Sequence, residues 1–409
     1  MPALQEPPPA RADTLTPTPP AAPATAPPFV APSLRPSVAR PRPASLPLLL
    51  AATFACSLGT GAATNGVFFI AEQRFAFGPT ANLLLGVVMG VGYVAAALAV
   101  GPLTRRISRR HARSLRAQLL AACALAGLSC LLPVIRPTAA SVWIFTLVFS
   151  AATGAMWPLV ESYVAAGRTG RTLRKASARF NIAWAGGVYV AFAAMSGFVE
   201  HHALAVLAAV ALLHLISIPA LATLPKDPPA DPDHPAHSRD PAAGRDRSVD
   251  LDCARRLLAA FRLLLVLSYV LISAAGPVYP AVLGAIGLSP AVKTFCASVW
   301  LGARVATFAV MERWHGWHGR RSTPAAAALL FAAGLVWSLR PVGAVDFVLA
   351  MTASGVGQGA IYAGAFYYAM EAEAGRVDAG GKHEALIGAG YLLGPLLGVA
   401  WFALFPVAT

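Results

Sequence analysis

Two ionisable side chains lie within long apolar runs, where a charge is costly. Glu161 is about six residues inside the end of the run over 141–166, and Arg304 is about seven residues inside the run over 290–311. Such groups usually face a cavity or a partner and serve a substrate, a proton or a gate. We take both as gating or ion-pair candidates. Glu161 would be a titratable carrier whose neutral form is favoured by desolvation, unless a cation such as Arg304 lies near. A purely structural ion pair is the alternative.

Other chemistries lack the residues they need. The chain has no Gly-x-Ser-x-Gly elbow and no P-loop. His383-Glu384 begins a zinc-protease pattern, but Ile387 stands where the second His is needed. The five cysteines form no Cys-x-x-Cys pair, so we expect neither a disulfide framework nor a metal site. The sequence predicts a protein that is not an enzyme and uses no cofactor.

A series of apolar runs must position Glu161 and Arg304. Hydrophobic residues make up 57% of the chain and charged residues only 12%, which is too apolar for a soluble domain. About 20 apolar residues in a helix cross the hydrocarbon core of a bilayer. The sequence predicts eleven such spans, over residues 46–71, 81–104, 116–135, 141–166, 178–199, 202–223, 257–284, 290–311, 323–340, 344–370 and 384–406. In the second of them, Gly86-x-x-x-Gly90 is a close-packing pattern between helices.

Lys and Arg mark alternate connections between these spans. Twenty-six of the 32 lie in the N-terminal tail and in every second connection, whereas the intervening connections hold only Arg74, Arg136, Lys293 and Arg340. Cytoplasmic loops carry such an excess. We therefore predict a multi-pass protein of the cell (inner) membrane with a cytoplasmic N-terminus. The net charge of +14 then indicates contact with anionic lipid of the bilayer and no nucleic-acid partner.

Composition divides the chain into four parts. Residues 1–44 form a Pro/Ala-rich tail that we expect to be disordered. Residues 224–255, rich in Asp, Pro and His, form a cytoplasmic central loop. The loop separates an N-terminal six-helix bundle over 45–223 from a C-terminal helical bundle with five spans over 256–409. The parts flanking the loop repeat weakly, since Arg106 and Arg313 follow the second and eighth spans. Secondary transporters often have this layout.

The connection after the second span carries a recognisable motif. It reads Gly101-Pro-Leu-Thr-Arg-Arg-Ile-Ser-Arg-Arg110 and resembles the loop motif Gly-x-Leu-x-Asp-Arg-x-Gly-Arg-Arg of the major facilitator superfamily. The matching positions are Gly101, Leu103, Arg106, Arg109 and Arg110. With the span number, the central loop and the charge alternation, the resemblance covers residues 46–406. The segment from Trp157 to Trp184 is similar to an uncharacterised bacterial branch of the superfamily.

The resemblance implies an all-α integral membrane protein of two pseudo-repeated helical bundles. It places the first, fourth, seventh and tenth spans around a central cavity. The substrate-cavity candidates on them are Asn65, Trp157, Glu161, Tyr269, Gln358, Tyr362 and Tyr367. Such side chains can bind and stack on a solute, or simply form hydrogen bonds between helices. Asn181 and Trp184 are either gate contacts or interface anchors.

Two features depart from the family. Arg105 stands where the motif has an Asp that, in the family, pairs with a basic group and helps to lock the outward-open state. We expect that lock to differ or to be absent. The family usually has twelve spans, whereas only three residues follow the last span here. We therefore expect eleven spans, a missing twelfth and a non-cytoplasmic C-terminus.

These observations together predict a secondary transporter. It would move a small solute by alternating access of the two bundles, driven by a coupling proton, another cation or the solute's own gradient. The alternative is a transport-incompetent relative that acts as a membrane receptor or scaffold, which the altered motif and the missing span favour. The sequence does not disclose the substrate.

Overall fold

The structure of the chain, a computed structural model, describes residues 44–111, 114–168, 170–195, 197–228, 245–275, 282–283, 285–288, 290–314, 316–372 and 377–404. Residues 1–43 of the predicted N-terminal tail and residues 229–244 of the predicted central loop lie outside these ranges. Every regular element within them is helical. The side chains of Asn65 and Arg110 also lie outside the described part.

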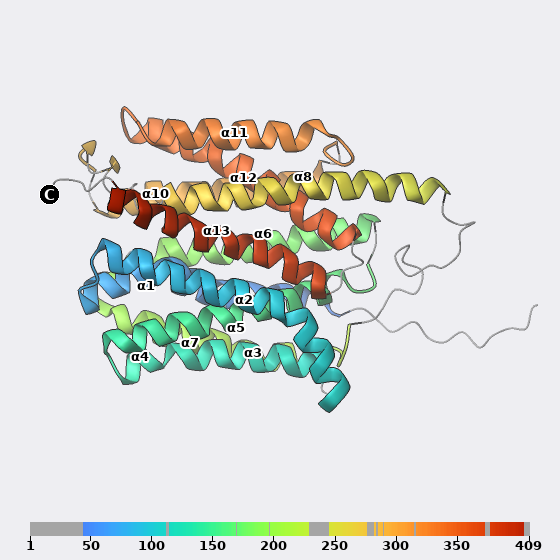
Figure 1. Cartoon of the computed structure of the whole chain (residues 1–409), viewed down its shortest axis with the longest axis horizontal. Helices are drawn as coiled ribbons and strands as arrows, with labels where there is room; N and C mark the ends of the chain where they lie inside the picture. Colours follow the sequence, from blue (N-terminus) through green and yellow to red (C-terminus); the bar gives the residue numbers. More distant parts are fainter. Residues whose placement is uncertain are drawn as a thin grey trace, which may run out of the picture. The chain divides into compact units, whose positions relative to one another are not determined.

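The described residues contain eleven long helical stretches, one for each predicted span, with α3 and α4 forming the third (Figure 1). Their bounds are α1 Leu46–Phe75, α2 Pro79–His111, α3 Leu115–Cys130, α4 Leu132–Ile135, α5 Ala139–Ala165, α6 Gly170–Met195, α7 Val199–Ala222, α8 Arg245–Ala275, α10 Pro290–Arg313, α11 Ser322–Ser338, α12 Ala344–Ala372 and α13 Val377–Leu404.

Three helices begin well before the starts that the hydropathy of the sequence predicts. Helix α6 begins at Gly170, ahead of the predicted start at residue 178. Helix α8 begins at Arg245, so the end of the predicted central loop is helical. Helix α13 begins at Val377, ahead of the predicted start at residue 384. All three predicted starts are wrong because charged residues near a helix end lower the mean hydropathy without breaking the helix. His383 and Glu384 therefore lie within α13, in its second turn. The sequence predicted that the helix would only begin at Glu384.

Helix α5, which carries Glu161, has well-defined ends. At its start the Thr138 hydroxyl accepts a hydrogen bond from the backbone N–H of Ser141, and the Ser141 hydroxyl accepts one from the backbone N–H of Thr138. This reciprocal cap satisfies backbone groups that a helix terminus leaves free. At its end the Arg168 guanidinium donates to backbone carbonyls of the last turn, at 2.9–3.1 Å. Fixed ends set the depth at which Glu161 lies.

Helices far apart in the sequence pack side by side. Helix α13 lies along α2 and also contacts α5 and α8. Helix α6 contacts α1 on one side and α10 and α12 on another. Helix α1 also packs on α7, α3 packs on α5 and α7, and α11 packs on α12. The α2–α13 and α6–α10 contacts therefore connect the first part of the chain with the last.

Glycines allow α2 and α13 to approach closely along their whole contact, which we call the α2–α13 seam. A Cβ added at Gly86 would lie 3.0 Å from the Pro395 ring, and one added at Gly90 would lie 2.6 Å from the Leu392 backbone. The predicted packing role of this glycine pair is confirmed. Nearer the other end of α2, a Cβ at Gly101 would collide with the Asp378 side chain.

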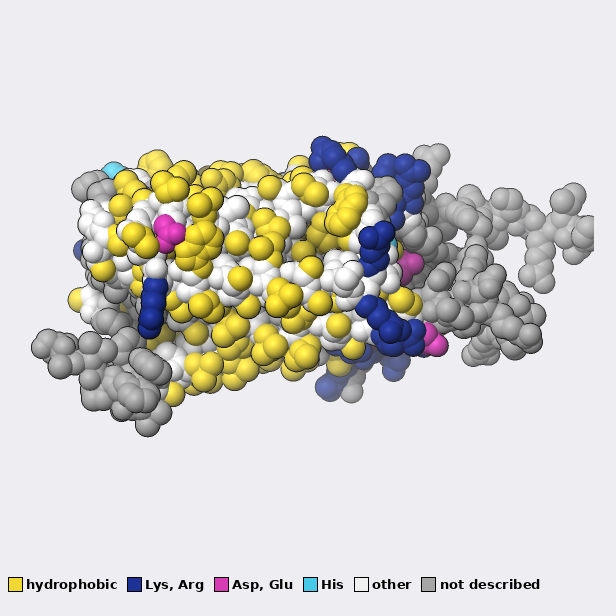
Figure 2. All heavy atoms as spheres, turned by 90° about the horizontal axis from the view of Figure 1, so that it is seen from above, with side chains coloured by type: hydrophobic (Ala, Val, Ile, Leu, Met, Phe, Trp, Pro, Cys, Tyr) yellow, Lys and Arg dark blue, Asp and Glu magenta, His cyan; other side chains and the backbone are white. Residues whose placement is uncertain are grey.

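The surface has the apolar character of a protein that spans a bilayer. Nine helices among the described residues are long and apolar enough to cross a membrane, judged by length and composition. Helix α11 is shorter, and basic residues lower the hydropathy of the first turns of α6. Apolar side chains cover the face shown in Figure 2, and Lys and Arg gather at one end of it.

We call that end the basic end. The exposed Lys and Arg that define it are Arg105, Arg106 and Arg109 on α2, Arg171 and Arg179 on α6, Arg255 and Arg256 on α8, Arg313 on α10, Arg320 and Arg321 before α11, and Lys382 on α13. Arg74, Arg136 and Arg340 are exposed at the opposite helix ends. The Lys and Arg of alternate connections in the sequence therefore gather at one end of the helices in the structure.

Candidate functional site

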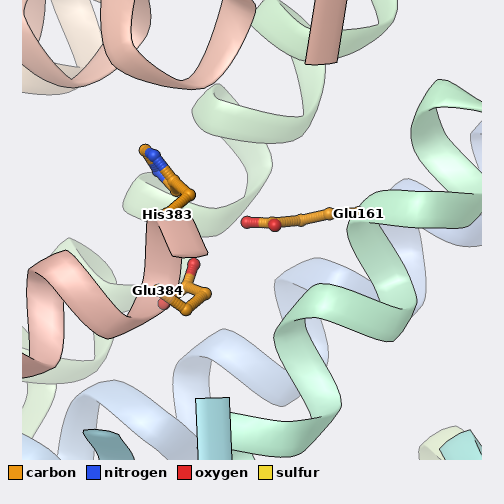
Figure 3. Close-up of side chains that lie close together, drawn as sticks. All are labelled: Glu161, His383 and Glu384. Carbon is orange, nitrogen blue, oxygen red and sulfur yellow. The ribbon is translucent and has the colours of Figure 1, made fainter. Parts of the chain in front are cut away.

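Three buried ionisable side chains meet between α5 and α13. Glu161 is fully buried, and its side chain extends toward the early turns of α13, where His383 and Glu384 lie (Figure 3). One ligand-type atom of each residue lies within 4.8 Å of the others. The α2 side chain Tyr93 adds to the group, because its hydroxyl donates a hydrogen bond to Glu384 Oε2. We call these four residues the acid cluster.

The acid cluster is buried but lacks hydrogen-bond partners, within the described ranges, for several of its polar atoms. Neither carboxylate oxygen of Glu161 and neither ring nitrogen of His383 has a hydrogen-bond partner among the described residues. None of the ion pairs in the described part of the chain includes Glu161 or Glu384. Buried polar groups normally have a partner, and two carboxylates at this separation repel each other. The arrangement can hold a proton between the carboxyl groups, or a cation with carboxylate and imidazole ligands.

The local sequence makes room for this contact. A Cβ added at Gly380, on the face of α13 that meets α5, would lie 2.5 Å from Glu161 Oε2 and 3.0 Å from the Pro158 Cα. Only glycine therefore lets α13 approach α5 closely enough for Glu384 and Glu161 to face each other. Pro158 lies one turn before Glu161 inside α5.

Arg304 occupies a second buried position, on α10, with 1% of its surface exposed. One of its terminal nitrogens donates to the Tyr269 hydroxyl of α8 and to Gln358 Oε1 of α12, both at 3.3 Å. Its guanidinium carbon lies 4.6 Å from the Trp184 ring centroid, 5.1 Å from that of Trp300 and 5.7 Å from that of Tyr362. We call this set the arginine cage.

Aromatic rings connect the arginine cage with the acid cluster. Trp184 stacks on Tyr362 at 5.0 Å, and Tyr362 meets the His383 ring edge to face at 5.1 Å. On a second path, Tyr391 of α13 contacts both Tyr93 and Tyr269. The two polar groups therefore belong to one continuous interior of rings and ionisable side chains, to which α2, α5, α6, α8, α10, α12 and α13 contribute.

Most of the residues predicted for a cavity belong to this interior. Tyr269, Gln358 and Tyr362 surround Arg304, and Glu161 lies in the acid cluster, but no ion pair joins Glu161 to Arg304 in the described part of the chain. The Asn65 side chain lies outside the described residues. Trp157 is buried against Phe180 of α6. Phe180 stacks on Phe366 of α12, and Phe366 in turn contacts the His383 ring of the acid cluster.

A small cleft near the basic end contains two further predicted residues. Asn181 and Tyr367 line it together with Arg174, Ser177, Ala178, Phe308, Met311, Trp317 and Ala363. Phe308 also contacts the Tyr362 ring at 5.8 Å. The Phe308 ring therefore lies between the cleft and the arginine cage. Trp184 belongs to the cage itself.

Two ion pairs join the facing helices at the basic end. Arg105, at the position where the superfamily motif has an Asp, pairs with Asp378 in the first turn of α13. Arg179 of α6 pairs with Glu312 of α10 at 3.0 Å. The base of this pair, Arg105, therefore stands at the motif's acid position, and the acid, Asp378, is its partner on α13. Arg106 and Arg109 line a surface hollow with Arg105 and Pro102, and Leu103 is half exposed.

Sequence reasoning missed Tyr93, His383, Glu384 and Trp300. His383 and Glu384 were considered only as an incomplete protease motif, because the predicted span began at residue 384. The signal that could have found them is the glycine pair Gly380-Gly381, followed two residues later by His and Glu without any helix-breaking residue. Tyr93 and Trp300 gave no signal apart from their aromatic character.

These features define a multi-pass α-helical membrane protein with a polar, ionisable interior. No protein-family model matches the chain, and no curated protein matches its sequence. Solved structures do match its fold. The chain aligns with the nucleoside transporter NupG with a TM-score of 0.55 and 15% identity, covering 89% of this chain and 92% of NupG.

Two further structures agree with that match. The human organic anion transporter MFSD10 (TETRAN) aligns with a TM-score of 0.62 at 13% identity, over 88% of this chain and 93% of that one. The proton:xylose symporter XylE, described as a major facilitator superfamily protein, aligns with a TM-score of 0.60 at 14% identity, over 88% and 89%. The chain therefore has the major facilitator fold, and the predicted resemblance is confirmed at the level of the fold.

Proposed function

We propose that the chain is a secondary transporter that moves a small solute by alternating access. Two bundles, over residues 45–223 and 256–409, rock against each other about the α2–α13 and α6–α10 contacts. Residues 224–255 connect them on the cytoplasmic side, and the basic end faces the cytoplasm of the cell that holds the protein in its inner membrane. NupG, MFSD10 and XylE, whose fold the chain shares, are all transporters by name, which supports this function.

The carboxyl pair of the acid cluster carries the proposal. Glu161 belongs to the first bundle and Glu384 to the second, so the charge on the pair acts directly on their contact. The two carboxyl groups lie within 4.8 Å of each other, so two negative charges there repel by at least roughly 3 kcal/mol for an effective dielectric constant of about 20. A shared proton removes that repulsion, and its loss favours separation of the bundles. Protonation and bundle movement are therefore coupled, and we infer that a proton is the coupling ion.

The other polar groups take roles that follow from their positions. Tyr93 holds the Glu384 carboxyl in place through its hydrogen bond. The ion pairs Arg105–Asp378 and Arg179–Glu312 close the cytoplasmic side, because each joins one bundle to the other. Asn65, Trp157 and Tyr367 stay cavity candidates. The Asn65 side chain lies outside the described part, Trp157 packs on Phe180, and Tyr367 lines the cleft near the basic end.

Flux measurements on the purified chain in liposomes test the proposal. Vesicles with a trapped pH-sensitive dye receive a panel of small solutes, and solute-driven proton movement is recorded for the wild type, for Glu161→Gln and for Glu371→Gln. Glu371 is a control carboxyl on α12 outside the acid cluster. We expect Glu161→Gln to abolish proton movement and Glu371→Gln to retain it.

The other outcomes are equally informative. Binding of a solute without flux would favour the receptor or scaffold over the transporter. Unchanged proton movement in Glu161→Gln would remove Glu161 from the coupling mechanism. Stabilisation of the wild type but not of Glu161→Gln by Mn²⁺ or Zn²⁺ would assign the acid cluster to a metal ion, since carboxylate and imidazole groups suit such ions.

A further inference from the structure

Arg304 is a buried cation without a buried anion. None of the ion pairs formed by the described residues includes it, although its side chain is almost fully enclosed. The groups that face it are the phenols of Tyr269 and Tyr362, the Gln358 amide and the indoles of Trp184 and Trp300. All five are neutral. An unpaired charge in an apolar interior is costly, so the site favours a ligand that brings a negative charge.

The guanidinium also has unused hydrogen-bonding capacity. It carries five N–H donors, and the described contacts are two long bonds of 3.3 Å from one terminal nitrogen to neutral oxygens. The Nε–H is buried without a partner. Arginine recognises carboxylates through two parallel N–H···O bonds, and such charge-assisted bonds are shorter and stronger than those to neutral groups. Neutral oxygens at 3.3 Å are therefore partners that a carboxylate would replace.

Aromatic walls define the body of such a ligand. Trp184 comes from α6, whereas Arg304, Trp300 and Tyr362 come from α10 and α12. In the closed arrangement Trp184 and Tyr362 stack on each other at 5.0 Å with an interplanar angle of 12°. When α6 moves away from α10 and α12, these two faces separate beside the guanidinium. A flat ring is the shape that fits between two parallel aromatic faces.

The path to this position is also suited to an anion. The cleft near the basic end is lined by Arg174 and Asn181 of α6, and its inner wall is Phe308, which contacts Tyr362. Arg304 and Phe308 lie one turn apart on α10. Movement of Phe308 would join the cleft to the arginine cage. A solute would then pass from one arginine to the next.

We propose that Arg304 binds the anionic group of a small planar organic acid, whose ring lies between Trp184 and Tyr362. The proposal rests on the transport function proposed above and names its substrate class. The charges support it, since an acid anion carried together with a proton on the Glu161–Glu384 pair adds no net charge to the interior. A cationic solute would instead lie beside the positive charge of Arg304, which repels it.

Matched ligands on the full-length purified protein test this substrate class. Thermal unfolding is followed with benzoate, nicotinate and indole-3-acetate, each beside its uncharged amide, and with benzylamine as the cation. We expect at least one acid to raise the unfolding temperature of the wild type, because a ligand that binds only the folded state stabilises it. The amides and the amine should have no such effect. Arg304→Gln should weaken acid binding at least tenfold, since it removes the charged partner.

Two further variants keep the test decisive. Arg313→Gln makes the same substitution at the exposed end of the same helix and should retain acid binding. If Arg304→Gln fails to fold, Gln358→Glu replaces it, because a carboxylate placed beside Arg304 competes with the ligand and should abolish acid binding. Equal stabilisation by acids and amides, no response to any of the acids, or full acid binding by Arg304→Gln would overturn the proposal.

Flux measurements separate this proposal from the one on which it rests. Transport of an uncharged or cationic solute that is unaffected by Arg304→Gln would overturn the anion site and leave the transporter standing. Binding of an acid through Arg304 without flux of any solute would leave the anion site standing and overturn transport.

Discussion

A single methyl group at the α2–α13 seam should open the seam. In Gly90→Ala the new Cβ would lie 2.6 Å from the backbone N and Cα of Leu392, whereas carbon atoms pack best at about 3.5–4.0 Å. The helices must therefore separate by roughly 1 Å. Overpacking of this kind costs about 1–3 kcal/mol, which corresponds to roughly a fivefold to hundredfold shift toward an open seam if the bundles move as proposed.

Thiol labelling can measure that shift. Leu83 lies on α2 toward the end opposite the basic end, buried against Gly398 of α13. In a background without native cysteines, Leu83→Cys is labelled by an impermeant maleimide only when the seam opens. The labelling rate should rise by about fivefold to a hundredfold when Gly90→Ala is added, following the same overpacking estimate.

Gly334→Ala is the matched control. Its Cβ would lie 2.6 Å from the Ala350 carbonyl oxygen, so the clash is equally close, but it falls between α11 and α12 of the same proposed bundle. We expect a loss of thermal stability with little change in labelling. An unchanged labelling rate in Gly90→Ala, or an equal rise in both variants, would refute the seam as the moving contact.

Four other substitutions follow from the described contacts. Arg105→Asp or Asp378→Arg alone should raise labelling at the basic end by no more than about fivefold, because the pair is partly exposed and such pairs contribute at most about 1 kcal/mol. The double exchange should restore the wild-type rate, and high salt should reduce the difference. Gln358→Glu should raise the unfolding temperature, since it places a carboxylate at 3.3 Å from the buried Arg304; a lower value would mean that desolvation of the new charge outweighs the pairing. Gly357→Ala, whose Cβ would meet the α11 backbone, should cost about 1–3 kcal/mol of stability in denaturation without altering seam labelling, and a tolerated alanine would contradict the packing.

The helices could be predicted from the sequence because a bilayer leaves few choices. A spanning segment must satisfy its own backbone hydrogen bonds, so each long apolar run becomes a helix, and all eleven runs did. The positions of Lys and Arg predicted which helix ends lie together at the basic end. Helix starts at Gly170, Arg245 and Val377 were missed, because a helix can extend beyond the apolar layer into water. Because α13 begins before the predicted span, Glu384 was predicted to lie at a helix end and was not recognised as a buried group.

The site could be predicted only in part. Glu161 and Arg304 could be named as candidates because a charge inside an apolar run is itself a signal, and Tyr269, Gln358 and Tyr362 could be named as candidates through the resemblance. Their partners could not be predicted, since the Arg105–Asp378 pair spans 273 residues of sequence and depends on how α2 packs on α13. Trp184 could be placed near a gate but not against Arg304, because that contact requires α6 and α10 to be neighbours.

The two indoles of the arginine cage give the protein a built-in optical signal. Trp184 and Trp300 have their ring centroids within 5.1 Å of a fixed positive charge, and at such a distance the field of that charge acts strongly on each ring. Neutralising the charge, or moving Trp184 away with α6, changes the field and therefore the colour of the indole emission. Movements of the interior should thus be visible in the intrinsic fluorescence of the unlabelled protein.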